Sequence, residues 1–139
     1  MQNLPTALQF ASGVFDMERK NAFPLICGGS SNTGSVINSC WKLERTGNWN
    51  QISGMKYERS HFTLNAINGT VIAVGGQNSS QKTNIGIKST ESFNYLHWSD
   101  DMIEDIPVRI HHHCTVTYNS TLLIVLGGQQ NGEVSTKVA

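Results

Sequence analysis

The residues of this sequence that are best suited to chemistry form a run of three histidines, His111 to His113. Alternate side chains of a strand face opposite sides, so His111 and His113 could share a face and begin a metal site. A metal site needs a third protein ligand, and the spacing of the other histidines and cysteines indicates none. His113 stands fourteen residues before a Gly-Gly pair, as His61 does, so both are predicted to be packing positions of a repeat. We expect no metal and no cofactor.

A second group of candidate residues is acidic and follows Trp98. Its members are Asp100, Asp101, Glu104 and Asp105. Paired carboxylates serve as general acid and base, or bind calcium, where they converge in a buried site. A polar segment between strands is better interpreted as a solvated loop. Since the sequence also has no Ser-His-Asp order and no phosphate-binding glycine loop, we expect no catalytic residues and predict that the chain is not an enzyme.

The composition argues against several classes of partner. The chain has 139 residues and a formal net charge of zero, and only 14% of the residues are charged. This leaves no electrostatic footprint for nucleic acid or for an acidic membrane surface. Residues 1–15 lack a basic segment followed by a continuous apolar run, so we expect no signal peptide there, and no run is long enough to span a bilayer. The compartment stays open between extracellular and cytoplasmic.

Glycine pairs that close apolar runs reveal an internal repeat. The runs are FPLICGG, VIAVGG and LLIVLGG, which end at Gly28-Gly29, Gly75-Gly76 and Gly127-Gly128. The first glycines of the pairs are separated by 47 and then by 52 residues. Trp49 and Trp98 follow the last glycine of their pairs by 20 and 22 residues, so the copies run in phase. A period of about 50 residues is typical of propeller blades.

Each copy is predicted to hold four short strands, because apolar or alternating segments recur between turn residues. In the first copy we expect strands over residues 12–17, 23–27, 36–43 and 49–52, and in the second over 61–66, 70–74, 89–95 and 98–102. The third copy supplies 113–118 and 122–126 and begins a further strand over 134–139. Residues 4–9 are interpreted as the tail of an earlier copy.

The order of these motifs resembles the kelch-repeat β-propeller family over nearly the whole chain: apolar strand, Gly-Gly, polar loop, aromatic strand, Trp, and then Met55 or Pro107. The resemblance implies an all-β fold, an incomplete kelch-type propeller of two four-stranded blades and part of a third. The implied boundaries are a tail of a preceding repeat at residues 1–10, blades at 11–55 and 56–107, and the partial blade at 108–139. It also implies that the glycine pairs, Trp49 and Trp98 pack between blades. Further blades or self-association would complete the propeller.

Two of the three cysteines, Cys27 and Cys40, fall in neighbouring strands of the first blade, and the third is Cys114. Three cysteines are too few for a disulfide scaffold, and their spacing fits no zinc pattern. Neighbouring antiparallel strands can be bridged where the register places the cysteines opposite. The CGG…SC arrangement resembles that of secreted kelch-repeat proteins of invertebrates, which implies a Cys27–Cys40 disulfide. Two packed thiols are the alternative.

In the kelch family, partners dock on the face built by the loops that leave the second strand of a blade and the loops that enter the next blade. The resemblance places Tyr57, Arg59, Asn78 and Arg109 on that face, and Tyr and Arg are enriched at binding hot spots. We therefore predict a protein–protein interaction module that binds a protein or peptide partner. One alternative is a secreted glycan-binding or galactose-oxidase-like propeller whose site lies in missing blades. Another is a truncated product without function.

Overall fold

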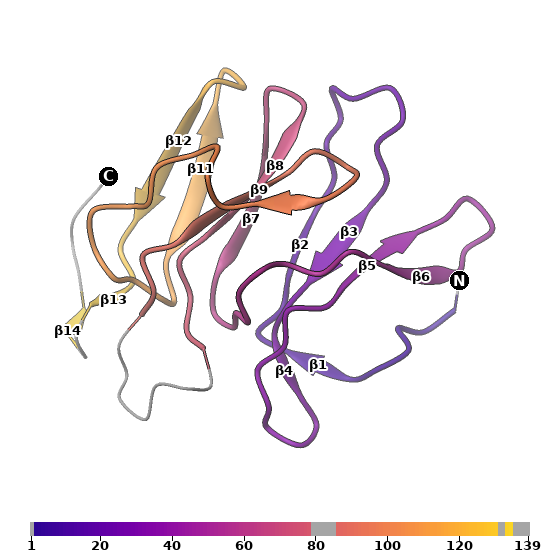
Figure 1. Ribbon diagram of the computed structural model, residues 1–139, viewed down its shortest axis with the longest axis horizontal. Coiled ribbons are helices and arrows are strands. Elements are labelled where there is room, and N and C mark those ends of the chain that lie inside the picture. The colour runs from indigo at the N-terminus through magenta and orange to yellow at the C-terminus, as the bar shows by residue number, and fades with distance from the viewer. Residues whose placement is uncertain (1, 79–85, 131–132, 135–139) are drawn as a thin grey trace.

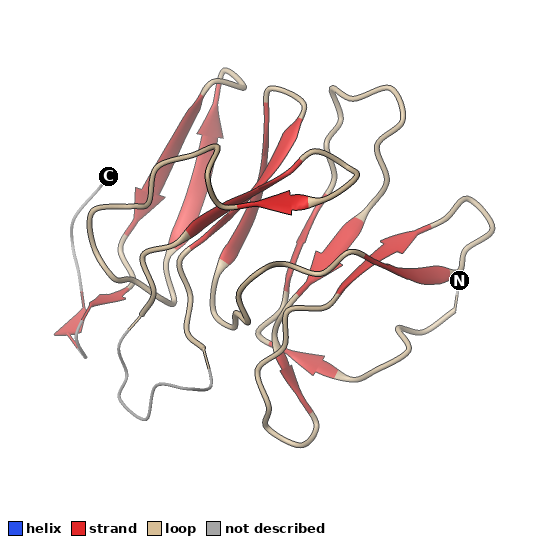
Figure 2. Ribbon diagram, in the orientation of Figure 1, coloured by secondary structure: helices blue, strands red, loops and turns tan. Residues whose placement is uncertain are grey.

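The computed structural model describes residues 2–78, 86–130 and 133–134, which form strands and loops but no helix (Figure 1). The first sheet has the order β2 (Ser12–Val14), β3 (Leu25–Cys27), β5 (Cys40–Leu43) and β6 (Trp49–Ile52). The second sheet has the order β7 (Thr63–Ile67), β8 (Thr70–Val74), β9 (Thr90–Phe93) and β10 (Trp98–Ser99). The third consists of β11 (Cys114–Tyr118) and β12 (Leu122–Leu126). All pairings are antiparallel, and Figure 2 shows how loops join the strands.

The three sheets stack side by side through their first strands. Strand β7 packs against β2 on one side and against β11 on the other. The first sheet therefore lies at one end of the molecule and the third at the other, with the second between them (Figure 1). This arrangement confirms the predicted fold class, an all-β, incomplete, propeller-like stack of two four-stranded sheets plus part of a third.

The second sheet is apolar on both faces because it has a neighbour on both sides. One core joins it to the first sheet and includes Leu25, Leu64 and Ala73. The other core joins it to the third sheet and includes Ile72 and Val125. Strand β8 contributes to both cores, which explains its continuous apolar sequence.

Glycine pairs allow the close approach of neighbouring sheets. Gly28 and Gly75 have positive φ angles of 63° and 60°, a region that L side chains rarely adopt. A Cβ atom on Gly28 would lie 2.5 Å from the carbonyl oxygen of Arg59, and one on Gly75 would lie 2.7 Å from that of Ile110. Each collision is with the chain segment that leads into the following sheet. The predicted packing role therefore applies to the first glycine of these two pairs.

The hairpin turns differ in length, and this corrects one expectation of register. Strands β7 and β8 pair from Ile67 to Thr70, which leaves two residues in the turn, whereas Tyr118 pairs with Leu122, which leaves three. The extra residue shifts the third copy by one position. His61 is therefore equivalent to His112, and the predicted equivalence of His61 and His113 was wrong.

Two short strand pairs lie outside the three sheets. β1 (Leu8–Gln9), which lies in the segment predicted as the tail of an earlier copy, pairs with β4 (Ser30–Ser31). β13 (Gln129–Gln130) pairs with β14 (Glu133–Val134). Most of the strand expected over 134–139 lies outside the described residues. Its described beginning, at Val134, pairs with β13.

Candidate partner-binding surface

The loops that follow the glycine pairs gather on one side of the molecule, at the bottom of Figure 1, while the β7–β8 and β11–β12 turns lie at the top. One pairing recurs on this side in each copy. Its members are Gln9 with Ser30, Ser60 with Gln77, and His111 with Gln129. The described residues 30–35, 56–60, 77–78, 108–111 and 129–130 form what we call the loop face. The predicted loop residues 79–85 and 131–132 lie outside the described part of the chain.

Three stacked rings lie where the inner strands begin. Phe10, His61 and His112 are spaced 51 residues apart, and all three have left-handed backbone angles, with φ of 57°, 53° and 55°. The ring centroids of Phe10 and His61 are 3.9 Å apart, and those of His61 and His112 are 3.8 Å apart. The N–H of His61 donates to the carbonyl of Phe10 (3.1 Å), and the N–H of His112 donates to that of His61 (3.0 Å). Equivalent residues of successive sheets therefore meet directly.

The pKa values of both histidines in this stack lie below the ordinary value for histidine. Burial, reinforced by the imidazoles of His112 and His111, lowers the pKa of His61 to about 4. Burial also lowers the pKa of His112, with His111 as the second cause. The side chain of His111 reaches across to the second copy, where its Nε2 lies 3.3 Å from the amide nitrogen of Gln77. This end of the stack therefore offers imidazole and amide hydrogen-bonding groups beside aromatic rings.

Arg59 is the one predicted binding residue whose position must be corrected. Its side chain is fully buried and forms an ion pair with the equally buried Glu91, with Nη2 and Oε1 2.8 Å apart. Further guanidinium N–H groups donate to the carbonyls of Gly75 and Ser89, both at 2.8 Å. A buried charge is tolerated when it is paired and hydrogen-bonded in this way. Arg59 is therefore a structural residue that cannot reach a partner in this conformation.

Glu91 also holds the loop that carries Tyr57. Its carboxylate accepts the backbone N–H groups of Lys56 (2.6 Å) and Tyr57 (3.1 Å). At the surface, Lys56 donates to Asp100 (2.6 Å) and the Tyr57 hydroxyl donates to the same carboxylate (3.1 Å). The hydrogen bond raises the pKa of Lys56 and lowers that of Asp100. Tyr57 is thus exposed but held in place, which lowers the entropy lost when a partner binds.

The remaining predicted binding residues differ in exposure. Arg109 is exposed in the segment that enters the third sheet, and Asn78 is half-buried after the second glycine pair. Tyr57 and Arg109 are therefore the long side chains of the prediction that reach solvent on the loop face.

Cys27 and Cys40 form a disulfide between β3 and β5, where the register places them directly opposite. Cys114 is a free thiol, exposed on β11. Within the described residues, no group of three or more His, Cys, Asp or Glu side chains is placed to hold a metal ion. The same part of the chain contains no helix that is long and apolar enough to cross a membrane.

Trp49 and Trp98 occupy matching places, each half-buried at the start of the outermost strand of its sheet. Trp49 pairs with Leu43, and Trp98 pairs with Phe93, whose ring it also stacks on at 5.0 Å. The indole N–H of Trp98 donates to the carbonyl of Ser53 (3.2 Å), in the segment between the first two sheets.

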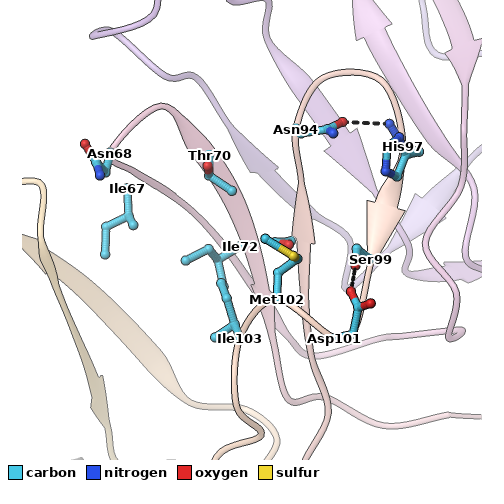
Figure 3. Close-up of a pocket in the computed structure, with 11 residues that line it drawn as sticks. Ile67, Asn68, Thr70, Ile72, Asn94, His97, Ser99, Asp101, Met102 and Ile103 are labelled. Carbon is cyan, nitrogen blue, oxygen red and sulfur yellow. Dashed lines mark hydrogen bonds between the residues drawn. The ribbon is translucent and has the colours of Figure 1, made fainter.

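A cavity of about 490 Å³ lies against the outer strands of the second sheet. Figure 3 shows Ile72, Met102 and Ile103 along it, with Asn94 bonded to His97 and Ser99 bonded to Asp101 at its polar edge. Ile72 belongs to the face that packs on the third sheet. The cavity therefore borders the core between the second and third sheets.

Comparisons with known proteins support the fold. No protein-family model and no curated protein matches the sequence. Among solved structures, a chain described as "Structure of YjhT" superposes on 99% of this chain with a TM-score of 0.78 and 14% sequence identity. This chain spans 43% of the length of that one. At such low identity, the similarity shows the fold alone.

Proposed function

We propose that the chain is part of a kelch-type propeller and serves as a protein–protein interaction module that binds a protein or peptide through the loop face. The observation that carries the proposal is the position of Tyr57. Its loop is fixed from inside by Glu91 and its hydroxyl by Asp100, yet the residue is 36% exposed. Aromatic anchors that are ordered before binding are typical of hot spots.

The distribution of residue types over the molecule supports the same face. The loop face includes exposed Arg109 and several Ser and Gln residues, a composition typical of adaptable binding surfaces. The opposite side carries short hairpin turns, which include Asn68 and Asn119 in Asn-X-Ser/Thr sequences. Glycans attached there would leave the loop face free.

A photo-crosslinking residue tests which face binds. We expect crosslinks to one protein when the residue replaces Tyr57 or Arg109, and none when it replaces Leu96 or Thr121, which are exposed in turns of the opposite side. With the captured partner purified, Arg109→Ala should weaken binding about tenfold. Capture from the turn side alone, or an unchanged affinity for Arg109→Ala and Tyr57→Ala together, would contradict the proposal.

The disulfide favours the second candidate, a secreted glycan-binding or oxidase-like propeller, because disulfides persist in oxidising compartments. Its sugar or metal site would lie in blades outside this sequence. Copper or iron in the purified full-length parent protein, or binding to a glycan array, would favour this candidate over the first.

A further inference from the structure

The third sheet has an apolar face that no described residue covers. Alternate residues of β11, together with their partners on β12, make up this face. They are the cross-strand pairs Cys114–Leu126, Val116–Ile124 and Tyr118–Leu122. The residues between them face the second sheet, since the Thr115 hydroxyl donates to Asn65 (2.6 Å). Val116, Tyr118 and Leu122 are 48%, 59% and 52% exposed. We call these six residues the open face.

The corresponding faces of the first two sheets are covered. Val116 and Ile124 occupy the places that Val14 and Leu25 hold in the first sheet. Leu25 is only 1% exposed because it shares a core with Leu64 and other residues of the second sheet. The second sheet is covered in its turn by the third. The fold therefore buries this face in the first and second sheets, and the open face is the equivalent face of the third sheet.

The backbone contacts between sheets also end at the third sheet. The second glycine of each earlier pair donates its N–H to the segment entering the next sheet, Gly29 to Arg59 (2.7 Å) and Gly76 to Ile110 (2.8 Å). Gly128 is the equivalent glycine of the third pair, and its N–H has no such acceptor among the described residues. The carbonyls of Phe10 and His61 each accept an N–H from the next copy, but that of His112 has no such donor among the described residues. A molecule that covers the open face should therefore accept a hydrogen bond from the Gly128 N–H and donate one to the His112 carbonyl.

The chain itself carries a matching surface at its other end. Leu64 and Ala73 of the second sheet are paired with each other and pack on Leu25 of the first sheet. The equivalent pair in the first sheet is Gly13 and Ile26. Gly13 is exposed, and Phe10, which begins the ring stack, is 54% exposed. A paired Gly and Ile fill nearly the same space as a paired Leu and Ala. The formal net charge of zero leaves no long-range repulsion between copies.

We propose that a second copy of this chain docks head to tail, with its first sheet on the open face of the third sheet. Such a contact uses different surfaces of the two copies, so two copies can form two equal seams and close a ring about one axis. The size is compatible with this, because the chain spans 43% of a solved chain of the same fold, and two copies remain shorter than that chain. The inference does not depend on which partner the loop face binds.

The test is the mass of the 139-residue chain in solution, measured by light scattering and native mass spectrometry over a dilution series. We expect a dimer of twice 15.3 kDa. Val116→Asp should raise the dimer dissociation constant at least about tenfold, because it places an unpaired carboxylate in the seam. Gly13→Arg should do the same from the other side, and Cβ contacts of 3.4 Å at Gly13 leave room for a side chain. Leu96→Asp, at a turn residue that is 78% exposed, is the matched control.

Mixing the two variants distinguishes a head-to-tail seam from other dimers. Each variant alone lacks one of the two surfaces, but the Gly13→Arg protein keeps its open face and the Val116→Asp protein keeps its first sheet. We expect the mixture to form a heterodimer, because one of its seams joins the two unaltered surfaces. A monomeric wild-type protein, a dimer unaffected by Val116→Asp, or one disrupted by Val116→Asp but not by Gly13→Arg would each overturn the proposal.

A measurement on the unmodified chain guards against variants that fail to fold. Cys114 is a free thiol on the open face, so the seam should cover it. We expect its reaction with a thiol reagent to slow several-fold as the protein concentration rises through the dimer transition. A rate that does not change with protein concentration would count against the seam even if the variants aggregate.

Discussion

Replacing Arg59 with Leu should remove a large part of the stability of the fold. The side chain is fully buried, and its guanidinium donates to Glu91, to the carbonyls of Gly75 and Ser89 and to the Ser89 hydroxyl. Leu keeps much of the buried volume but leaves the Glu91 carboxylate without its cation. Breaking a buried ion pair from one side costs about 3–5 kcal/mol. We therefore expect a loss of about 4 kcal/mol in the free energy of unfolding, out of a total of about 5–15 kcal/mol for a typical domain.

Urea unfolding followed by tryptophan fluorescence, at one fixed protein concentration, measures this loss. Arg109→Leu is the matched control, because Arg109 is exposed, and it should change stability by less than about 0.5 kcal/mol. The first sheet suggests a second variant, since Trp41 holds the place of Glu91 in the strand register. The double variant Arg59→Leu, Glu91→Trp should lose less free energy of unfolding than the two single variants together, because it contains no unpaired buried charge. Equal losses for Arg59→Leu and Arg109→Leu would show that the buried ion pair does not stabilise the fold.

Three further predictions use the same unfolding measurement. Gly75→Ala should cost about 2–3 kcal/mol and Gly34→Ala only about 1 kcal/mol, because both glycines have positive φ but only Gly75 meets a neighbouring carbonyl oxygen, at 2.7 Å. Equal costs would contradict the packing role of the pair. Cys27→Val with Cys40→Thr, the residues found at the same places in the second sheet, should lose about 3 kcal/mol, and a reducing agent should remove most of the difference from the wild type. Burial lowers the pKa of His113 from 6.5 to about 4, so the unfolded state binds more protons in this range, and His113 should contribute a loss of about 3 kcal/mol in stability as the pH drops through it, in addition to the loss from His61. His113→Phe should make that pH dependence shallower, and an unchanged slope would argue against it.

The sequence predicted the apolar strands better than the polar ones, because apolar runs and glycine pairs are local signals. The strands expected over 12–17, 36–43 and 98–102 are shorter in the structure, at 12–14, 40–43 and 98–99. The runs ending at Gly75 and Gly127 became β8 and β12 with the expected bounds, 70–74 and 122–126. The register of the third copy was not predictable by counting back from the glycines. Such a count cannot tell that the additional residue lies in the β11–β12 turn, where a three-residue loop replaces Asn-Gly.

Burial of charge was the second feature that the sequence concealed. Arg59 has the type and position of a hot-spot residue, and its partner Glu91 is distant along the chain. The sequence did contain one indication of this ion pair. Glu91 is an acidic residue within the predicted strand 89–95, whose sheet is expected to pack against another sheet on each face. A charge in such a strand is rarely buried without a partner, which makes an inward Arg the natural complement.

Copies spaced 51 residues apart stack so that equivalent residues meet. Nuclear Overhauser effects between ring protons in a selectively His- and Phe-labelled protein test this stacking directly, because the centroids of the stacked rings are 3.9 and 3.8 Å apart. We predict contacts from Phe10 to His61 and from His61 to His112. Contacts from His61 to His113 in place of His112, or no contact between rings of different copies, would contradict the account.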